Sequence, residues 1–317
     1  MPGFIIKDTA GNTIVEDGTI VENPTLYVDD TNGNDANTGS AAGSGNALKT
    51  IQAAVDKLGN TIRGIATINV SAGDYFEMVT VEGISGSELR ITGAGEGSTT
   101  ISGANSGSPS TSVRNQCMLV QNNAIGRIVI TGFTMKQAVK NGVALKFNSG
   151  NSEINACTFT AIDKFISPNG VEGNGAVSAW FNGGVTFIVD TTIVDVLGIG
   201  FAIDGCQMDF FTTGSTVTNV GTPGEAYTGM CLYINRGGQV NVLCTGCSFS
   251  ARAGTDMYAV ILNQGYFYHQ EALTLANAAV GVRARWESFF TGTGTVTETS
   301  VTTSSDLTTG AVRTNGS

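Results

Sequence analysis

Acidic residues dominate one stretch of the chain, between Lys164 and Arg236, which contains no lysine or arginine. Its six carboxylates are Glu172, Asp190, Asp195, Asp204, Asp209 and Glu225. Two carboxylates beside a glycosidic bond can cleave it, one as general acid and the other as base or nucleophile. Asp190 and Asp209 are the candidate catalytic residues, because stacking FIVDTT on DFFTT would place them on neighbouring coils. The alternative is that these carboxylates are exposed structural residues.

Lyase chemistry on a uronate needs a different set of groups. A charge neutraliser must hold the substrate carboxylate while a basic residue removes the neighbouring proton. The acidic stretch offers no lysine or arginine for this task, and Arg236 is the nearest one downstream. The sequence therefore favours a protein that is not an enzyme, with a polysaccharide lyase or a glycoside hydrolase as the alternative.

Aromatic rings are the candidate glycan-binding groups, because an exposed ring can stack on the apolar face of a sugar. The candidates are Trp180, Tyr266 and Tyr268, and Trp286 could act in the same way. The single histidine, His269, follows Tyr268 directly and has no partner motif. Large aromatic residues also fill cores and subunit interfaces, which is the alternative for each of them.

Metal and redox motifs are weak. Cys244 and Cys247 form the one close cysteine pair, but a zinc site needs four ligands and no second pair exists. We therefore expect buried, structural cysteines.

The loop at residues 29–37 is rich in Asp and Asn and is the candidate Ca²⁺ site, although it lacks the spacing of an EF-hand. Side chains that hydrogen-bond their own backbone in turns are the alternative. No other cofactor is expected.

Composition bounds the class of protein. The 317 residues include 43 glycines and 5 prolines, with 41% hydrophobic and 13% charged residues. Low charge at this apolar content argues against disorder. The net charge of −10 argues against binding to nucleic acid or to anionic membranes. No run of about 18 apolar residues predicts a membrane span. The N-terminal sequence shows no secretion signal, so we expect synthesis in a cytoplasm.

One helix is predicted, over residues 49–58. Ile51, Ala54, Val55 and Leu58 recur at helical spacing and form one apolar face. Thr50 is the expected N-cap, and Gly59 or Asn60 can supply a left-handed residue after the last turn. A single short helix before many strands indicates a cover for the end of a stack of strands.

Short strands follow from residue 65, and an irregular repeat runs through them. The repeating segments are ITGFTM (130–135), INACTF (154–159), VDTTIV (189–194), TTGSTV (212–217) and CTGCSF (244–249). A repeat of this length with short strands predicts a solenoid. The two expected interior columns are Met135, Phe159, Val194, Val217 and Phe249, and Phe133, Cys157, Thr192, Ser215 and Cys247.

Both ends of the chain look different from the middle. Residues 1–25 predict one or two small hairpins and could form an attachment arm. Residues 291–317 alternate threonine with other residues, which is typical of a strand with little apolar surface. Such a segment is stable only when it pairs with a neighbouring strand or chain. The main domain is therefore expected at residues 26–290.

The segment YVDDTNGNDANTG followed by LKTIQAAVDKL resembles the opening of pectin-lyase-like right-handed parallel β-helix proteins. The matching residues are Tyr27, Val28, Gly33, Asp35, Asn37, Gly39, Thr50, Ile51, Ala54 and Val55. The resemblance covers residues 26–103 and implies an all-β right-handed parallel β-helix with a short N-terminal capping helix. It is unspecific for function, because the fold carries lyases, hydrolases, epimerases and phage tailspikes.

The remaining features look most like a tailspike or tail-fibre subunit of a tailed phage. This resemblance implies a structural virion protein, a homotrimer, that attaches to other virion proteins through its N-terminal arm and binds a polysaccharide of the host surface. A capsid or neck decoration protein is a further alternative. Neither a nucleic acid nor a membrane is an expected partner.

Overall fold

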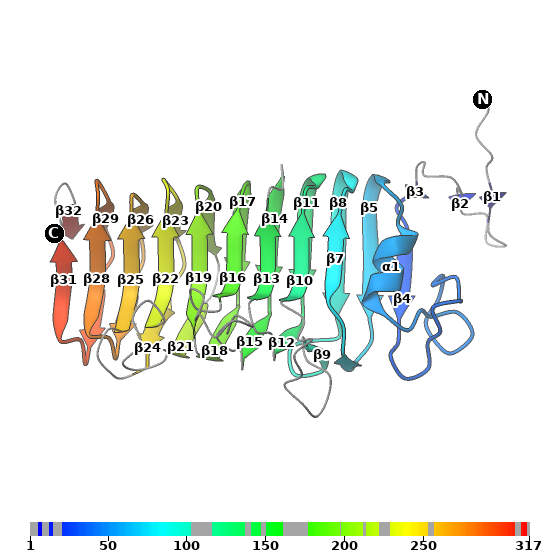
Figure 1. The fold of residues 1–317 in the computed structure, drawn as a ribbon, viewed down its shortest axis with the longest axis horizontal. Coiled ribbons are helices and arrows are strands. Elements are labelled where there is room, and N and C mark those ends of the chain that lie inside the picture. The colour runs from blue at the N-terminus through cyan, green and yellow to red at the C-terminus, as the bar shows by residue number, and fades with distance from the viewer. Residues whose placement is uncertain are drawn as a thin grey trace, which may run out of the picture.

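Short apolar strands build three long parallel sheets in the computed structural model (Figure 1). The structure describes residues 6–7, 13–14, 21–102, 116–136, 141–146, 150–160, 177–196, 198–211, 214–221, 229–252, 257–307 and 312–315. From β7 onward, each turn of the chain adds one strand to each sheet in the same order, and each strand pairs in parallel with its equivalent in the next turn. The fold is therefore a parallel β-helix, as the sequence predicted.

We name the sheets I, II and III in the order in which the chain visits them from β7 onward. Sheet I contains β7 (Val79–Glu82), β10 (Gln116–Gln121), β13 (Asn141–Lys146), β16 (Val177–Asn182), β19 (Ile199–Asp204), β22 (Gly229–Asn235), β25 (Met257–Asn263), β28 (Val280–Arg285) and β31 (Thr303–Leu307). Sheet II contains β3 (Val21–Glu22), β4 (Thr25–Val28), β5 (Thr61–Val70), β8 (Ser85–Gly93), β11 (Ala124–Thr131), β14 (Asn151–Asn155), β17 (Val185–Val189), β20 (Gln207–Phe211), β23 (Gln239–Val242), β26 (Tyr266–His269), β29 (Phe289–Gly292) and β32 (Val312–Asn315). Sheet III contains β6 (Gly73–Tyr75), β9 (Thr99–Ser102), β12 (Thr134–Lys136), β15 (Thr158–Thr160), β18 (Thr192–Val196), β21 (Thr216–Val220), β24 (Cys247–Ala251), β27 (Leu273–Ala276) and β30 (Val296–Thr299).

The core is a continuous column between the sheets, because alternate side chains of every strand point inward. Its largest members are fully buried phenylalanines: Phe133, Phe159, Phe181, Phe201, Phe210, Phe249, Phe267 and Phe290. Rings of successive coils contact one another, as in the parallel pair Phe267 and Phe290 at 4.8 Å between centroids. This burial of apolar area is the main favourable contribution to the stability of the solenoid.

The predicted columns are correct except at one coil. Met135 pairs with Phe159, and Val217 pairs with Phe249, as expected. Phe159, however, pairs with Ile193 and not with the predicted Val194. Thr191 accordingly takes the buried place predicted for Thr192. The prediction was wrong by one residue, and such a slip exchanges the inner and outer faces of a strand.

Helix α1 (Ile51–Lys57) covers the start of sheet I, where the first coil has no strand of that sheet (Figure 1). Thr50 is the N-cap and accepts a hydrogen bond from the Ala53 N–H at 3.1 Å, and Gly59 has φ +68°, both as predicted. The Glu77 carboxylate accepts two further helix N–H groups, those of Ile51 and Gln52. Together these groups satisfy the free donors of the first turn.

The ends of the described chain pair with their neighbours. β1 (Ile6–Lys7) and β2 (Thr13–Ile14) form an antiparallel pair, in line with the predicted hairpin. β3 lies within the first 25 residues and already pairs with β5 of sheet II. The threonine-rich C-terminal segment supplies β30, β31 and β32, which pair with the preceding coil of the same chain. Among the described residues, no helix has the length and hydropathy needed to cross a membrane.

Candidate functional site

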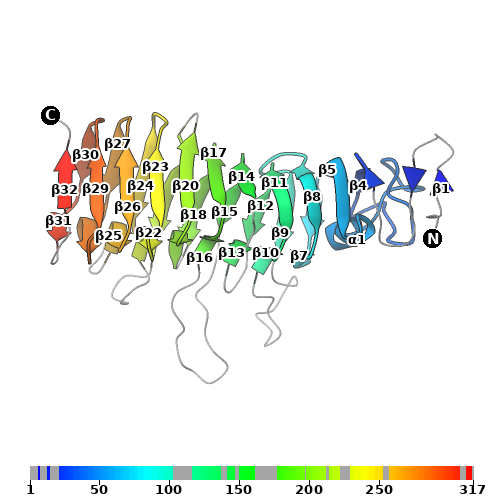
Figure 2. The same ribbon diagram turned by 90° about the horizontal axis from the view of Figure 1, so that it is seen from above.

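The outer face of sheet II carries the best candidate site, from β17 to β29. In β20, Met208 and Phe210 point into the core, so Gln207, Asp209 and Phe211 point outward. The parallel register then aligns outward residues of successive strands into rows. Figure 2 shows these strands side by side along the long axis of the molecule. We call this surface the sheet II face.

A network of amides surrounds one carboxylate at the centre of the sheet II face. The Gln207 side-chain amide donates to both carboxylate oxygens of Asp209, at 2.9 and 3.0 Å. Asn241 Nδ2, on the next coil, donates to Asp209 Oδ1 at 2.6 Å. Gln239 Nε2 donates in turn to Asn241 Oδ1 at 3.1 Å. These donors fix the carboxylate, which is only 6% exposed, in one orientation. We call these four residues the amide–carboxylate network.

Aromatic rings flank the network on its C-terminal side. Tyr266 and Tyr268 of β26 align with Gln239 and Asn241 of the network. Phe289 of β29 then aligns with Tyr266. The rings of Tyr266 and Phe289 lie at the surface, 36% and 46% exposed. Two of the predicted glycan-binding residues, both on β26, therefore lie two strands from the predicted Asp209.

The N-terminal side of the network is also aromatic. Phe187 of β17 aligns with Asp209, and its ring contacts that of Phe211 at 5.5 Å between centroids. Phe211 is exposed, as are Phe289 and Trp286. The sequence analysis missed Phe187, Phe211 and Phe289. The alternation of inward and outward side chains along each strand could have identified them, because it distinguishes an outward Phe such as Phe211 from the inward Phe210 beside it.

Trp286 lies in the turn that leads from β28 to β29. It is 55% exposed and has φ +48°, and Glu287 after it has φ +55°. A bulky residue in the left-handed region is strained, and such strain is retained where the surroundings impose it. The turn enters β29 three residues later, so this indole lies at the border of the sheet II face.

Asp190 occupies a corner, away from the amide–carboxylate network. Val189 pairs with Phe211, so Asp190 lies one residue past the end of β17, with φ +42°. Asp209 lies two residues before the end of β20. The two predicted carboxylates are on neighbouring coils, as expected, but about 10 Å apart along the strand direction. The Asp209 carboxylate accepts hydrogen bonds from the side-chain amides of Gln207 and Asn241.

The other sequence candidates lie elsewhere. Trp180 is on β16 of sheet I and packs, half-buried, on a small apolar cluster around Met230 and Tyr258. It therefore lies on a different sheet from Tyr266. His269 is fully buried beside the rings of Phe267 and Phe290, so it does not face the sheet II surface. Burial raises the pKa of the Cys157 thiol to about 12, in line with a structural cysteine.

The acidic loop at residues 29–37 uses its carboxylates to hold its own turns. Asp29 Oδ1 accepts the N–H groups of Thr31 and Asn32, and the Asn32 bond holds the pKa of Asp29 below its usual value. Asp35 accepts the N–H groups of Lys49 and Thr50 before the helix. Among the described residues, no group of three or more His, Cys, Asp or Glu side chains comes together as a metal site.

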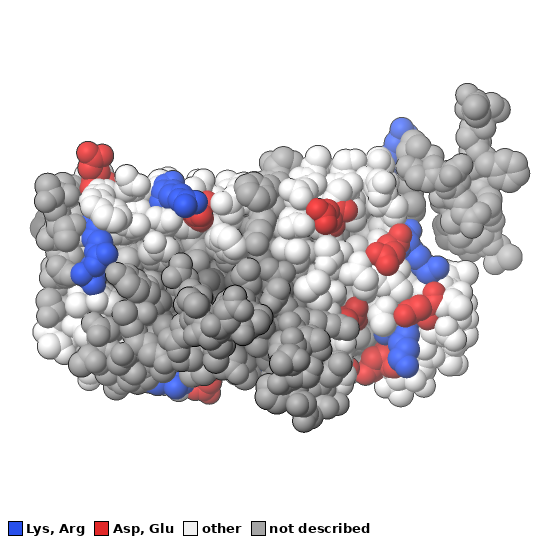
Figure 3. All heavy atoms as spheres, in the orientation of Figure 1, with Lys and Arg blue, Asp and Glu red and all other residues white. Residues whose placement is uncertain are grey.

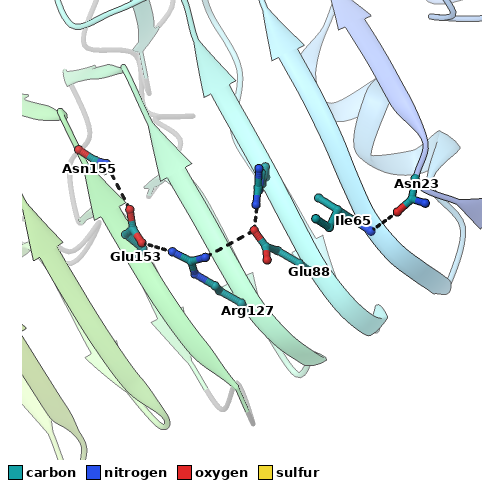
Figure 4. A network of polar contacts seen from close by, with 7 residues as sticks. Asn23, Ile65, Glu88, Arg127, Glu153 and Asn155 are labelled. Atoms are coloured by element: carbon teal, nitrogen blue, oxygen red, sulfur yellow. Dashed lines mark hydrogen bonds and ion pairs between the residues drawn. The ribbon is translucent and has the colours of Figure 1, made fainter.

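Ion pairs cover the N-terminal part of the outer surface of sheet II (Figure 4). Arg127 lies between two carboxylates, pairing with Glu88 at 3.8 Å and closely with Glu153. Arg90 pairs with Glu88, and Asn155 donates to Glu153 at 3.2 Å. Charged groups of this part therefore neutralise one another. On the face seen in Figure 3, the described acidic and basic side chains are likewise interspersed.

Comparison with known proteins gives likenesses among solved structures alone. No family model matches the chain, and no curated protein matches it. Among solved structures, the chain is similar to the crystal structure of a GH136 lacto-N-biosidase from Eubacterium ramulus. The two share 10% sequence identity over 89% of this chain and 67% of that chain, with a TM-score of 0.34. The function must therefore be argued from the residues of the sheet II face.

Proposed function

We propose that the protein binds extended, uncharged glycan chains through the sheet II face, without cleaving them. The observation that carries this proposal is the amide–carboxylate network, set between Phe187 of the preceding strand β17 and the exposed ring of Tyr266 on the following strand β26. Amide and carboxylate groups are donors and acceptors for sugar hydroxyls. Exposed rings supply large apolar area beside them.

Charge complementarity defines the class of glycan. The five strands β17, β20, β23, β26 and β29 contain one carboxylate, that of Asp209, and no lysine or arginine. A polyanionic chain of uronates would meet this carboxylate with no cation on those strands to balance it. The face therefore fits a neutral chain.

The same contacts support binding over cleavage. A glycosidase needs one carboxyl group as acid and another as base or nucleophile around a single bond. Here both oxygens of Asp209 already accept hydrogen bonds from carboxamides, and the five strands carry no second carboxylate to act with it. The polysaccharide lyase or glycoside hydrolase of the sequence analysis is thus the less favoured function.

The test is a binding and size assay on one panel of neutral and acidic bacterial surface glycans. We expect a neutral glycan to bind without any loss of length. The variant Tyr266→Ala/Phe289→Ala should bind at least tenfold more weakly, whereas Phe76→Ala, which removes an exposed ring on another part of the chain, should not. Shortening of a glycan, or preference for a polyanionic one, would contradict the proposal.

The wider role is the second part of the proposal. From the short N-terminal arm, the acidic β-helix and the threonine- and glycine-rich C-terminal segment, we propose that this face serves a tailspike- or tail-fibre-like subunit in a phage particle, where it contacts glycans of the host surface. The subunit would be a homotrimer attached through residues 1–25. Light scattering should then give three times the chain mass of 32.7 kDa. A monomer at all concentrations would argue against this assembly.

A further inference from the structure

Two cysteine sulfurs meet at the corner between β23 and β24. The Sγ atoms of Cys244 and Cys247 are 2.6 Å apart. Other sulfur contacts in the protein are longer, such as that of Cys157 Sγ to the Asn155 carbonyl oxygen at 3.3 Å. A disulfide bond measures about 2.05 Å. The pair is thus closer than the hydrogen-bonded thiols of the same protein and near to bonding distance.

The backbone of the corner brings the two residues together. Gly246 has φ +77°, a left-handed conformation that glycine adopts without strain. This turn folds the chain back so that Cys247 begins β24 with its side chain in the core. The corner also stacks tightly on the coil below, because a Cβ at Gly214 would clash with the Gly246 carbonyl oxygen. The close approach of the sulfurs is therefore built into the solenoid.

We propose that Cys244 and Cys247 are a dithiol that oxidises to an intrachain disulfide, which clasps this corner three residues after Asn241. The sequence analysis treated both as inert buried cysteines. A low-molecular-weight disulfide such as oxidised glutathione is the oxidant. The Cys244 thiolate attacks one sulfur of that disulfide and releases one glutathione thiolate. The Cys247 thiolate then attacks the Cys244 sulfur and releases the second, so two protein thiols become one disulfide and two glutathione thiols form.

The local electrostatics give the order of attack. A hydrogen bond from the Cys247 thiol lowers the pKa of Cys244, and the same contact raises the pKa of Cys247. Cys244 is thus the first to become a thiolate, which is the nucleophile in exchange. Both side chains are almost fully buried, so we expect the exchange to be slow in the native state and fast during refolding.

The test counts free thiols in the whole chain. Protein refolded in a glutathione redox buffer, then denatured without reductant and alkylated, should take up four alkyl groups, because the chain has six cysteines. Before alkylation, its mass should be lower than that of the reduced protein by two hydrogens. A digest should contain the Cys244–Cys247 link. Reductant should restore six alkylated cysteines. Six alkyl groups after refolding, or a link between other cysteines, would overturn the proposal.

Two variants separate the pair from the other cysteines. Cys247→Ser should take up five alkyl groups whether oxidised or reduced, and should show no linked peptide. Cys206→Ser, which removes a buried cysteine from another corner, should take up three when oxidised and keep the link. The oxidised wild-type protein should also melt several degrees higher than the reduced protein. An equal melting temperature in both states would contradict the role as a clasp.

Discussion

Single side chains decide what the sheet II face can do. Asp209 points outward, yet the amides of Gln207 and Asn241 almost cover it. A carboxylate held in this way has a fixed orientation. The rings of Phe211, Tyr266 and Phe289 near it remain at the surface. The same alternation that exposes these groups buries their neighbours, so each outward substitution tests the site and each inward one tests the core.

Two buried threonines give a matched test of the core. Thr186 Oγ1 is fully buried and has no hydrogen-bond partner in the described part of the chain. Thr186→Val should therefore raise the free energy of unfolding by about 1 kcal/mol, because it removes an unsatisfied hydroxyl at equal volume. Thr191→Val should lower it by about 1 kcal/mol, since its hydroxyl donates to the Val189 carbonyl oxygen. Denaturant unfolding of both variants checks the two signs, and equal signs would contradict this argument.

The Asp29 carboxylate predicts a small pH dependence of stability. Its pKa is held below the usual value of 3.8, chiefly by the N–H of Asn32. The folded state therefore gains stability from the ionised form above that value, and this gain is lost as the pH falls through the lowered pKa. Asp29→Asn should be less heat-stable than the wild type at pH 6, and the difference should shrink as the pH falls below 3.8. Melting curves over this range measure it.

At the scale of elements, the predictable parts are those that local sequence determines. The period of Ile51, Ala54 and Val55 and the cap Thr50 were enough to place α1. Strand pairing across insertions was not predictable at every coil. The steps between repeats vary, so nothing local distinguished Ile193 from Val194 as the inward residue. For the same reason the sequence could name Asp209, Tyr266 and Tyr268, but could not place them on one face.

The side chain of Gln52 in α1 pairs with the backbone of β7 in sheet I, as a neighbouring strand would. Gln52 Oε1 accepts the Thr80 N–H at 2.6 Å, and Gln52 Nε2 donates to the Thr80 carbonyl oxygen at 3.1 Å. Gln52→Ala should lower the free energy of unfolding by about 1–3 kcal/mol, because two backbone groups of β7 lose their partner. Alanine favours helix, so α1 itself is not weakened. Lys57→Ala in the exposed last turn is the control, and an equal loss there would contradict this role.

The last coils tolerate no added volume at Gly292. This glycine pairs with His269, and a Cβ on it would overlap the His269 backbone oxygen and imidazole. Gly292→Ala should cost about 1–3 kcal/mol, because the packed column has no room to relax. Gly45→Ala, in a loop where a Cβ meets nothing within 4 Å, should change stability little. Thermal melting of both variants checks this difference. If Gly292→Ala leaves the melting temperature unchanged, the final coil is loosely packed and this argument is wrong.

At the scale of the molecule, the solenoid converts single residues into a long surface. Each coil repeats the sheet II face at a spacing of about 4.8 Å, so the rows from β17 to β29 span about 20 Å. N-terminal to the sheet II face, the ion pairs of Arg127 with Glu88 and Glu153 cover the outer surface of sheet II. A ligand that follows the long axis therefore meets rings, amides and rings again in sequence, whereas a ligand that crosses it meets only one strand.

This arrangement predicts that affinity depends on glycan length. With a bound neutral glycan identified, its oligosaccharides of increasing length should bind with falling Kd until they span the 20 Å from Phe187 to Phe289, and longer chains should gain little. Isothermal titration of the length series measures the plateau. Phe187→Ala should shorten the length at which the plateau appears, because it removes the contact at one end. A monosaccharide that binds as tightly as the longest chain would show instead a single pocket and would remove the basis for an extended site.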